Sequence, residues 1–115
     1  MSVCDLTDKA CEPCQGGVPP LSASEVQNYL KQVHDDWDYD RVKGCITRRL
    51  IFKGFAKAVY TANLAAFLAD REGHHPDVSF GWGYCSVTFT THEAGGLTEN
   101  DFICAAKFDQ MIAPG

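Results

Sequence analysis

Two pairs of strand-like segments recur along the chain, and each pair is interrupted by a glycine-containing turn. Residues 45–52 are rich in strand-forming side chains, and residues 84–91 alternate apolar with polar side chains. A shorter strand-like segment precedes each of them, at residues 37–39 and 77–80, before Lys43-Gly44 and Gly81-Trp82-Gly83. Strands joined by tight turns pair antiparallel, so the sequence predicts two β-hairpins.

Three segments with apolar residues at helical intervals flank and separate these hairpins. They cover residues 21–34, 55–73 and 98–111. Ser22 and Glu25 have the spacing of a capping box, and we expect the first helix to run to about His34. Gly73 is expected to end the second helix, because Pro76 cannot continue it. Thr98 and Asp101 repeat a capping pattern at the start of the third helix.

The predicted order is therefore α-β-β-α-β-β-α. An antiparallel sheet with one apolar face is most simply covered by all the helices on that face. The sequence predicts an α+β two-layer sandwich, a four-stranded antiparallel sheet with three helices on one face. Residues 21–115 are expected to form this single domain. Residues 1–20 contain Gly16-Gly17 and Pro19-Pro20 without an apolar period, which favours a flexible leader.

The charge balance and the apolar stretches exclude several classes of partner. Fifteen acidic residues against ten Lys and Arg give a net charge of −5, which argues against a nucleic-acid partner. No apolar stretch approaches the roughly 20 residues needed to span a bilayer, so no membrane partner is expected. Residues 1–9 lack the pattern of a signal peptide. We therefore expect a cytoplasmic location.

Six cysteines are expected to be reduced thiols in that compartment. Cys45, Cys85 and Cys104 lie on strand or helix patterns and are expected in the core. Cys4, Cys11 and Cys14 fall in the leader, and the purpose of these three is open. They are expected to be inert thiols, but a structural metal site or a redox pair is also compatible with Cys11-Glu12-Pro13-Cys14.

Three histidines lie at the ends of predicted elements, where clefts form. His74 and His75 follow the second helix, and His92 ends the strand that should pair with residues 77–80. A hairpin through Gly81-Trp82-Gly83 would bring position 76 or 77 close to position 90 or 91, and so bring the three imidazoles together. Imidazole titrates at a pH of about 6.5, so such a cluster can supply a base and an acid at once.

The spacing of these histidines is part of a longer pattern. It consists of Asp70, three residues, His74-His75-Pro76, five residues, Trp82, nine residues, His92, eight residues and Asp101. This pattern resembles the signature of the pterin-4a-carbinolamine dehydratase family. The family is also resembled, at compatible spacings, at Trp37, Phe52, Phe55, Thr91-His92-Glu93 and Gly96-Leu97, so that the resemblance covers about residues 22–112.

The resemblance implies the same fold that the patterns predict, in a homodimer or homotetramer. It also implies an activity, the loss of water from a 4a-hydroxytetrahydropterin to give a quinonoid dihydropterin. That reaction recycles the tetrahydropterin cofactor of aromatic amino-acid hydroxylases, with which the chain would be linked functionally. It needs an acid at the departing oxygen and a base at the ring nitrogen, and we expect no cofactor and no metal.

The resemblance also implies roles for individual residues. His74, His75 and His92 would be catalytic, with His74 and His92 as exchangeable acid and base and His75 holding the hydroxyl or the pyrazine edge. Asp70 and Asp101 would orient imidazoles or favour their charged form. The predicted substrate-binding residues are Asp70, Trp37, Pro76, Trp82, Thr91, Glu93 and Asp101, with the two tryptophans as pocket walls.

Structural roles and other functions compete with this interpretation. His74 could satisfy helix carbonyls, Asp101 could simply cap a helix, and Trp37 and Trp82 could be core or turn residues. A histidine metal site is disfavoured because no His-x-x-x-His or Glu-x-x-His pair is present. The fold could also serve as a dimerisation module for a transcription factor, or bind a pterin without dehydrating it.

Overall fold

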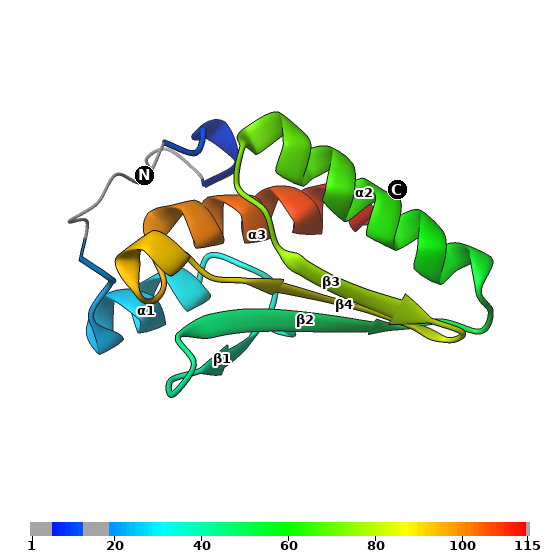
Figure 1. Cartoon of the computed structure of the whole chain (residues 1–115), viewed down its shortest axis with the longest axis horizontal. Coiled ribbons are helices and arrows are strands. Elements are labelled where there is room, and N and C mark those ends of the chain that lie inside the picture. The colour runs from blue at the N-terminus through cyan, green and yellow to red at the C-terminus, as the bar shows by residue number, and fades with distance from the viewer. Residues whose placement is uncertain (1–5, 13–18, 115) are drawn as a thin grey trace.

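The structure, a computed structural model, describes residues 6–12 and 19–114, and the order of its elements matches the predicted one (Figure 1). The helices are α1 (Ala23–Leu30), α2 (Ala56–Glu72) and α3 (Glu99–Ile112). The strands are β1 (Asp38–Asp40), β2 (Cys45–Ile51), β3 (Asp77–Gly81) and β4 (Tyr84–Phe89). Two short 3-10 turns are added, η1 (Leu6–Asp8) and η2 (His92–Ala94).

The four strands form one antiparallel sheet in the order β1-β2-β4-β3. Each predicted hairpin is present. The two hairpins are joined into one sheet by pairing of the two longer strands, β2 and β4, at its centre. Thr47 and Thr88 are opposite one another in that pairing, and their hydroxyl oxygens are 2.8 Å apart. The predicted fold class, an α+β sandwich with an antiparallel sheet, is confirmed.

Alternation along the strands decides which face of the sheet is covered. Cys85, Val87 and Phe89 of β4 are buried on one face, and α2 and α3 lie over that face (Figure 1). The intervening positions of β4 are only partly buried and polar. Two layers result because residues two apart on a strand point to the same side.

Helix α2 ends where the sequence predicted. Gly73 follows it in the left-handed conformation, with φ of 67°, and its N–H donates to the Ala69 carbonyl. The His74 N–H donates to the same carbonyl, so the chain leaves the helix sharply at this point. No helix within residues 6–12 and 19–114 has the length and apolar character that crossing a membrane requires.

Helix α1 is shorter than predicted, because it ends at Leu30 rather than near His34. The Gln32 N–H already turns back to the Tyr29 carbonyl, and the His34 N–H donates to the Asp109 carboxylate of α3 instead of a helix carbonyl. The apolar period continues to Val33 because that side chain is buried beyond the end of the helix.

The β3–β4 turn is tighter than the three-residue turn that the sequence suggested. Gly81 pairs with Tyr84, so only Trp82 and Gly83 lie in the turn. Gly83 has φ of 87°, a conformation that lets the chain reverse within two residues. Asp77 therefore lies opposite Thr88 instead of position 90 or 91. His92 begins η2 instead of ending the strand.

The described part of the leader has a defined place on the domain. Leu6 in η1 is buried in the core, and residues 6–12 lie against α3. This packing against α3 differs from the extended or mobile leader that was expected. The sequence did not indicate it, because a single buried leucine produces no periodic apolar pattern. The expected flexibility of residues 1–20 stays a prediction. Cys4 and Cys14 fall outside the described residues.

Asp109, near the end of α3, ties three other segments to that helix. Its carboxylate accepts a hydrogen bond from Arg48 of β2 at 2.6 Å and from the Trp37 indole N–H at 2.9 and 3.0 Å. The His34 N–H donates to it as well. Arg48 and Asp109 are both largely buried, so each charge has lost most of its contact with water. Their ion pair compensates for that loss.

We predict that Asp109→Ala lowers the free energy of unfolding by about 3 kcal/mol, because it leaves the Arg48 charge buried without a partner. Urea unfolding followed by circular dichroism measures the change. Asp109→Asn, which keeps an acceptor for Trp37, should lower the free energy of unfolding by less than Asp109→Ala does. Asp35→Ala, at an exposed position, should change the free energy by no more than about 0.5 kcal/mol. A loss below about 1 kcal/mol in Asp109→Ala would contradict the role given to this carboxylate.

Candidate active site

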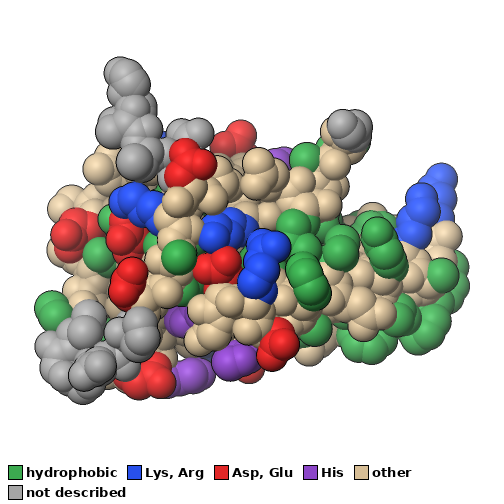
Figure 2. All heavy atoms as spheres, turned by 90° about the horizontal axis from the view of Figure 1, so that it is seen from above, with side chains coloured by type: hydrophobic (Ala, Val, Ile, Leu, Met, Phe, Trp, Pro, Cys, Tyr) green, Lys and Arg blue, Asp and Glu red, His purple; other side chains and the backbone are tan. Residues whose placement is uncertain are grey.

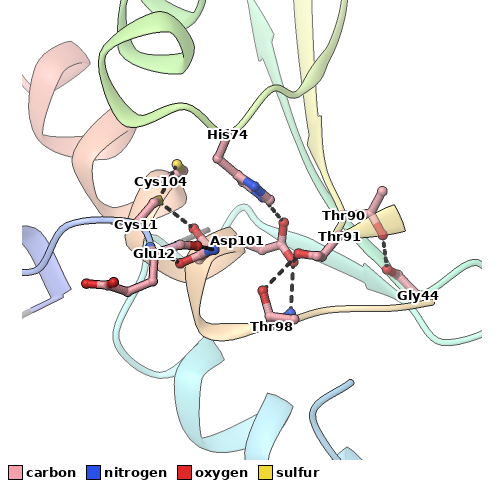
Figure 3. A network of polar contacts seen from close by, with 10 residues as sticks. Cys11, Glu12, Gly44, His74, Thr90, Thr91, Thr98, Asp101 and Cys104 are labelled. Carbon is pink, nitrogen blue, oxygen red and sulfur yellow. Dashed lines mark hydrogen bonds and ion pairs between the residues drawn. The ribbon is translucent and has the colours of Figure 1, made fainter. Parts of the chain in front are cut away.

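A buried carboxylate joins three segments at one end of the sheet (Figure 3). The Asp101 side chain is fully buried at the start of α3. Its Oδ1 lies 2.6 Å from the Nε2 of His74, which follows α2. Its Oδ2 accepts from the Thr91 hydroxyl at 2.8 Å and from the Thr98 N–H at 2.9 Å. Asp101 therefore caps α3 and holds a histidine with the same group.

Local sequence signals put each of these groups in place. Gly73 ends α2 in the left-handed conformation, and the chain therefore turns out of the helix at His74. Thr98 and Asp101 have the capping spacing that starts α3. Thr91 follows β4 and forms a backbone bridge with Gly96, which returns the chain toward α3. The three signals are local, but the meeting point is set by packing of α2 and α3 on the sheet.

The hydrogen-bond pattern is satisfied when Nε2 of His74 donates to Asp101. Asp101 receives bonds from a hydroxyl and a backbone N–H, so its carboxylate acts as an acceptor. The ring atom of His74 that faces it, Nε2, is then the donor. Within the described residues Nδ1 of His74 has no hydrogen-bond partner in the protein, and it is the ring nitrogen left for exchange of a proton.

The His74 ring is confined but not sealed. Its side chain is 12% exposed, and its plane lies parallel to the Phe89 ring, with centroids 6.1 Å apart and an angle of 9°. Phe89 is itself fully buried at the end of β4. One face of the imidazole is therefore packed, and its orientation is fixed by Phe89 and Asp101 together.

His74 lies in the wall of a small hollow of about 190 Å³. Glu93 of η2, which the sequence also predicted as a site residue, lines the same hollow. The remaining lining comes from the end of α2, the start of α3 and the leader, namely Cys11, Glu12, Glu72, Gly73 and Asn100. The leader thus forms part of the surroundings of His74, which the sequence did not indicate.

His92 lies on a second, larger hollow of about 970 Å³ on the face of the sheet that the helices do not cover. Its other lining residues are Asp38, Tyr39, Asp40, Arg41, Lys43, Cys45, Thr47, Asp77, Thr88 and Thr90. His92 and Glu93 are adjacent in η2, so this turn contributes one side chain to each hollow.

His75 and Pro76 lead from His74 into β3. His75 is exposed and Pro76 is half-buried. Neither the hollow at His74 nor the one at His92 is lined by all three histidines, and their convergence on one pocket stays a prediction. Asp70 is exposed on α2 and has no hydrogen bond to a histidine there, so the orienting role inferred for it also stays a prediction.

The two tryptophans are not brought together. Trp37 is buried in the core, at ring-centroid distances of 5.9 Å from Phe89 and 6.4 Å from Phe108. Trp82 is 72% exposed in the β3–β4 turn, at the opposite end of β3 from Pro76. In this chain Trp37 is thus a core residue and Trp82 is a turn residue. Contact of either tryptophan with a ligand stays a prediction.

Thr91 was expected to offer a polar contact to a ligand. It is instead buried, with its hydroxyl donating to Asp101 and lying 2.8 Å from the Thr98 hydroxyl. In this arrangement Thr91 acts on His74 through Asp101, and a direct contact with a ligand stays a prediction.

Sequence reasoning missed Phe89, Thr98 and Cys104 as neighbours of the site. The available signals were the capping spacing of Thr98 to Asp101 and the helical spacing of Cys104, which is three residues after Asp101 on the same side of α3. Among residues 6–12 and 19–114, no three His, Cys, Asp or Glu side chains are grouped so that they could hold a metal ion.

Known proteins resemble this chain in sequence and in fold. Residues 19–111 match the family model for pterin 4 alpha carbinolamine dehydratase. Proteins provisionally named pterin-4-alpha-carbinolamine dehydratase are 46% identical in Nitrosomonas europaea, over 96% of each chain, and 46% identical in Methylococcus capsulatus, over 98% of each chain. A crystal structure from Brucella melitensis, described as a transcriptional coactivator/pterin dehydratase, has a TM-score of 0.75 and 31% identity, covering 82% of this chain and 99% of that one. The chain belongs to the pterin 4 alpha carbinolamine dehydratase family.

Proposed function

We propose that this protein eliminates water from a 4a-hydroxytetrahydropterin to give the quinonoid dihydropterin. It would thereby recycle the tetrahydropterin cofactor of an aromatic amino-acid hydroxylase in the cytoplasm. Membership of the family supports the dehydratase activity. The assignment of hydroxylase recycling goes further and is part of this proposal.

Elimination needs two proton transfers and no change of oxidation state. The hydroxyl leaves C4a as water after receiving a proton, and a base removes the proton from the ring nitrogen. We assign these steps to His74 and His92, in exchangeable roles, and the holding of the hydroxyl or pyrazine edge to His75. Asp70, Asp101, Pro76, Thr91 and Glu93 would support binding. No cofactor or metal takes part in these steps.

The observation that carries the proposal is the 2.6 Å contact between His74 Nε2 and Asp101 Oδ1. A buried carboxylate that holds one ring nitrogen as a donor leaves the other nitrogen in a fixed direction for proton transfer. A histidine that only capped α2 would need no such partner. The Phe89 ring adds to this support because it restricts rotation of the imidazole.

Substitution of the histidines should separate catalysis from stability. We predict that His74→Ala and His92→Ala each lower turnover of 4a-hydroxytetrahydropterin by about 10²–10⁴-fold, because each removes a proton-transfer group. His75→Ala should mainly raise KM. The double change at His74 and His92 should be little worse than the poorer single change. Stopped-flow absorbance of quinonoid dihydropterin, after subtraction of the uncatalysed rate, measures these effects.

His34→Ala is the matched control, since His34 is the remaining histidine and is exposed at the opposite end of α3. It should retain turnover. Near-normal rates in the double variant, with an unchanged melting curve, would remove the histidines from the mechanism. Pterin binding without product formation by the unmodified protein would favour a binding module instead.

Turnover should survive removal of metal ions, since proton transfer alone is proposed. We expect protein dialysed against EDTA to keep its full rate, with residual zinc and iron measured by mass spectrometry. Loss of rate that added zinc restores would overturn this, and repetition with Cys11→Ala would show whether the leader supplies a ligand.

We further propose that the chain forms a homodimer or homotetramer. Large apolar side chains gather at the end of the molecule where α2 begins (Figure 2). On α2 itself, Tyr60 and Phe67 are 65% and 59% exposed, and because they are seven residues apart they lie on one face of the helix. Strand β3 is at the edge of the sheet and exposes Val78 and Phe80. Such surfaces favour association over exposure to water.

Light scattering after size exclusion should give two or four times the chain mass of 12.6 kDa. Tyr60→Lys with Phe67→Lys should shift the protein toward smaller species, because charge on both positions opposes burial of that helix face. Val42→Lys is the control, since Val42 is 97% exposed in the β1–β2 turn. A monomeric unmodified protein would contradict the proposed assembly.

A further inference from the structure

Two cysteines from distant parts of the chain meet beside the candidate site. The sulfur of Cys11, in the leader, lies 3.3 Å from the sulfur of Cys104 on α3 (Figure 3). Cys104 is fully buried, whereas Cys11 is half-buried and lines the hollow at His74. Among the described cysteines, Cys45 and Cys85 have no such sulfur neighbour.

Hydrogen bonds on both sides hold Cys11 against Cys104. The Cys11 N–H donates to Glu72 of α2 at 3.1 Å. The next residue, Glu12, exchanges two bonds with the Asn100 side chain, at 3.0 Å and 2.6 Å. Lys107 in turn donates to Glu72 at 2.8 Å. Burial alone would raise the pKa of Glu72, but the bonds from Lys107 and Cys11 outweigh it and lower that pKa. Glu72 therefore remains an anionic acceptor for the leader.

We propose that Cys11 and Cys104 are a redox-modification site, which closes to an intramolecular disulfide when the protein meets a hydroperoxide. A disulfide bond is about 2.05 Å long, so the sulfurs must approach by only a little more than about 1 Å. The half-buried leader can supply that movement without displacing α3. This inference does not depend on the proposed dehydratase function.

The reaction balances with hydrogen peroxide as the two-electron oxidant. The Cys11 thiolate attacks one peroxide oxygen, which forms an S–O bond, breaks the O–O bond and releases hydroxide that takes up the thiol proton as water. Cys104 then attacks the sulfur of the Cys11 sulfenic acid. The S–S bond forms, the S–O bond breaks, and the departing hydroxide takes the Cys104 proton as a second water. A dithiol reductant reverses the bridge.

The surroundings distinguish the two sulfurs. The Cys11 thiol faces the Asn100 carbonyl at 3.6 Å, so Cys104 is left as the donor in the bond between sulfurs. That hydrogen bond and burial both raise the pKa of Cys104, which keeps it a neutral thiol. Cys11, which solvent can reach, is therefore the sulfur that meets the oxidant, and Cys104 is the resolving thiol.

The bridge would tie residues 6–12 covalently to α3 until it is reduced. Cross-links between positions far apart in sequence restrict the unfolded chain strongly, so oxidation should raise the melting temperature. It would also fix one wall of the hollow at His74, because Cys11 and Glu12 belong to that wall.

Treatment of the full-length protein with a slight molar excess of hydrogen peroxide tests the proposal. We expect a mass loss of about 2 Da, corresponding to two hydrogens, and a Cys11–Cys104 linked peptide on digestion without reductant. The melting temperature should rise by roughly 5–10 °C, and dithiothreitol should restore both mass and melting temperature.

Single-cysteine variants make the assignment specific. Cys11→Ala and Cys104→Ala should each abolish the mass loss and the rise in melting temperature, whereas Cys14→Ala and Cys85→Ala should retain both. If Cys104→Ala fails to fold, two other measurements still test the bridge. They are the mass and melting temperature of Cys11→Ala, a change at a half-buried position, and the peptide map of the unmodified protein. A Cys11–Cys14 bridge, a bridge between two chains, or oxidation beyond sulfenic acid without a bridge would overturn the proposal.

Discussion

The buried carboxylate of Asp101 is the interaction on which this end of the molecule depends. A charge without exposure to solvent must be satisfied by hydrogen bonds, and here three segments supply them. Thr91 comes from the end of β4, Thr98 from the start of α3 and His74 from the end of α2. The position of the candidate catalytic histidine and the packing of helix layer on sheet are therefore parts of one arrangement, and moving any member would leave the charge short of partners.

Helix α3 carries a second carboxylate that holds several segments together. Asp101 satisfies groups at one end of the helix, and Asp109, two turns later, binds Arg48, Trp37 and the His34 N–H at the other. An acidic residue at a helix start can cap the helix, or it can hold a side chain of another segment. Asp101 performs the first through its Oδ2 and the second through its Oδ1, so both interpretations of the sequence apply to one group.

The leader illustrates a contact that sequence patterns do not report. Its attachment to α2 and α3 includes the buried side chain of Leu6, backbone groups of Cys11 and Glu12, the ion pair of Lys9 with Glu99, and one pair of sulfur atoms. None of these creates a periodic pattern, so an irregular Gly- and Pro-containing segment was the natural expectation. Because this attachment reaches the hollow at His74, the surroundings of the candidate site include residues that precede the matched family region.

The sequence by itself determined the element order, the antiparallel two-layer fold and the family. Strand and helix periods report local conformation and the buried side, and motif spacing identified His74, His92 and Asp101. Only the tertiary structure decided that Thr91 supports Asp101 and that Trp37 lies in the core. It also placed Trp82 far along β3 and brought Cys11 to Cys104. Those outcomes depend on strand register and on how helices pack, and both are set by contacts between residues distant in the chain, which a local period cannot encode.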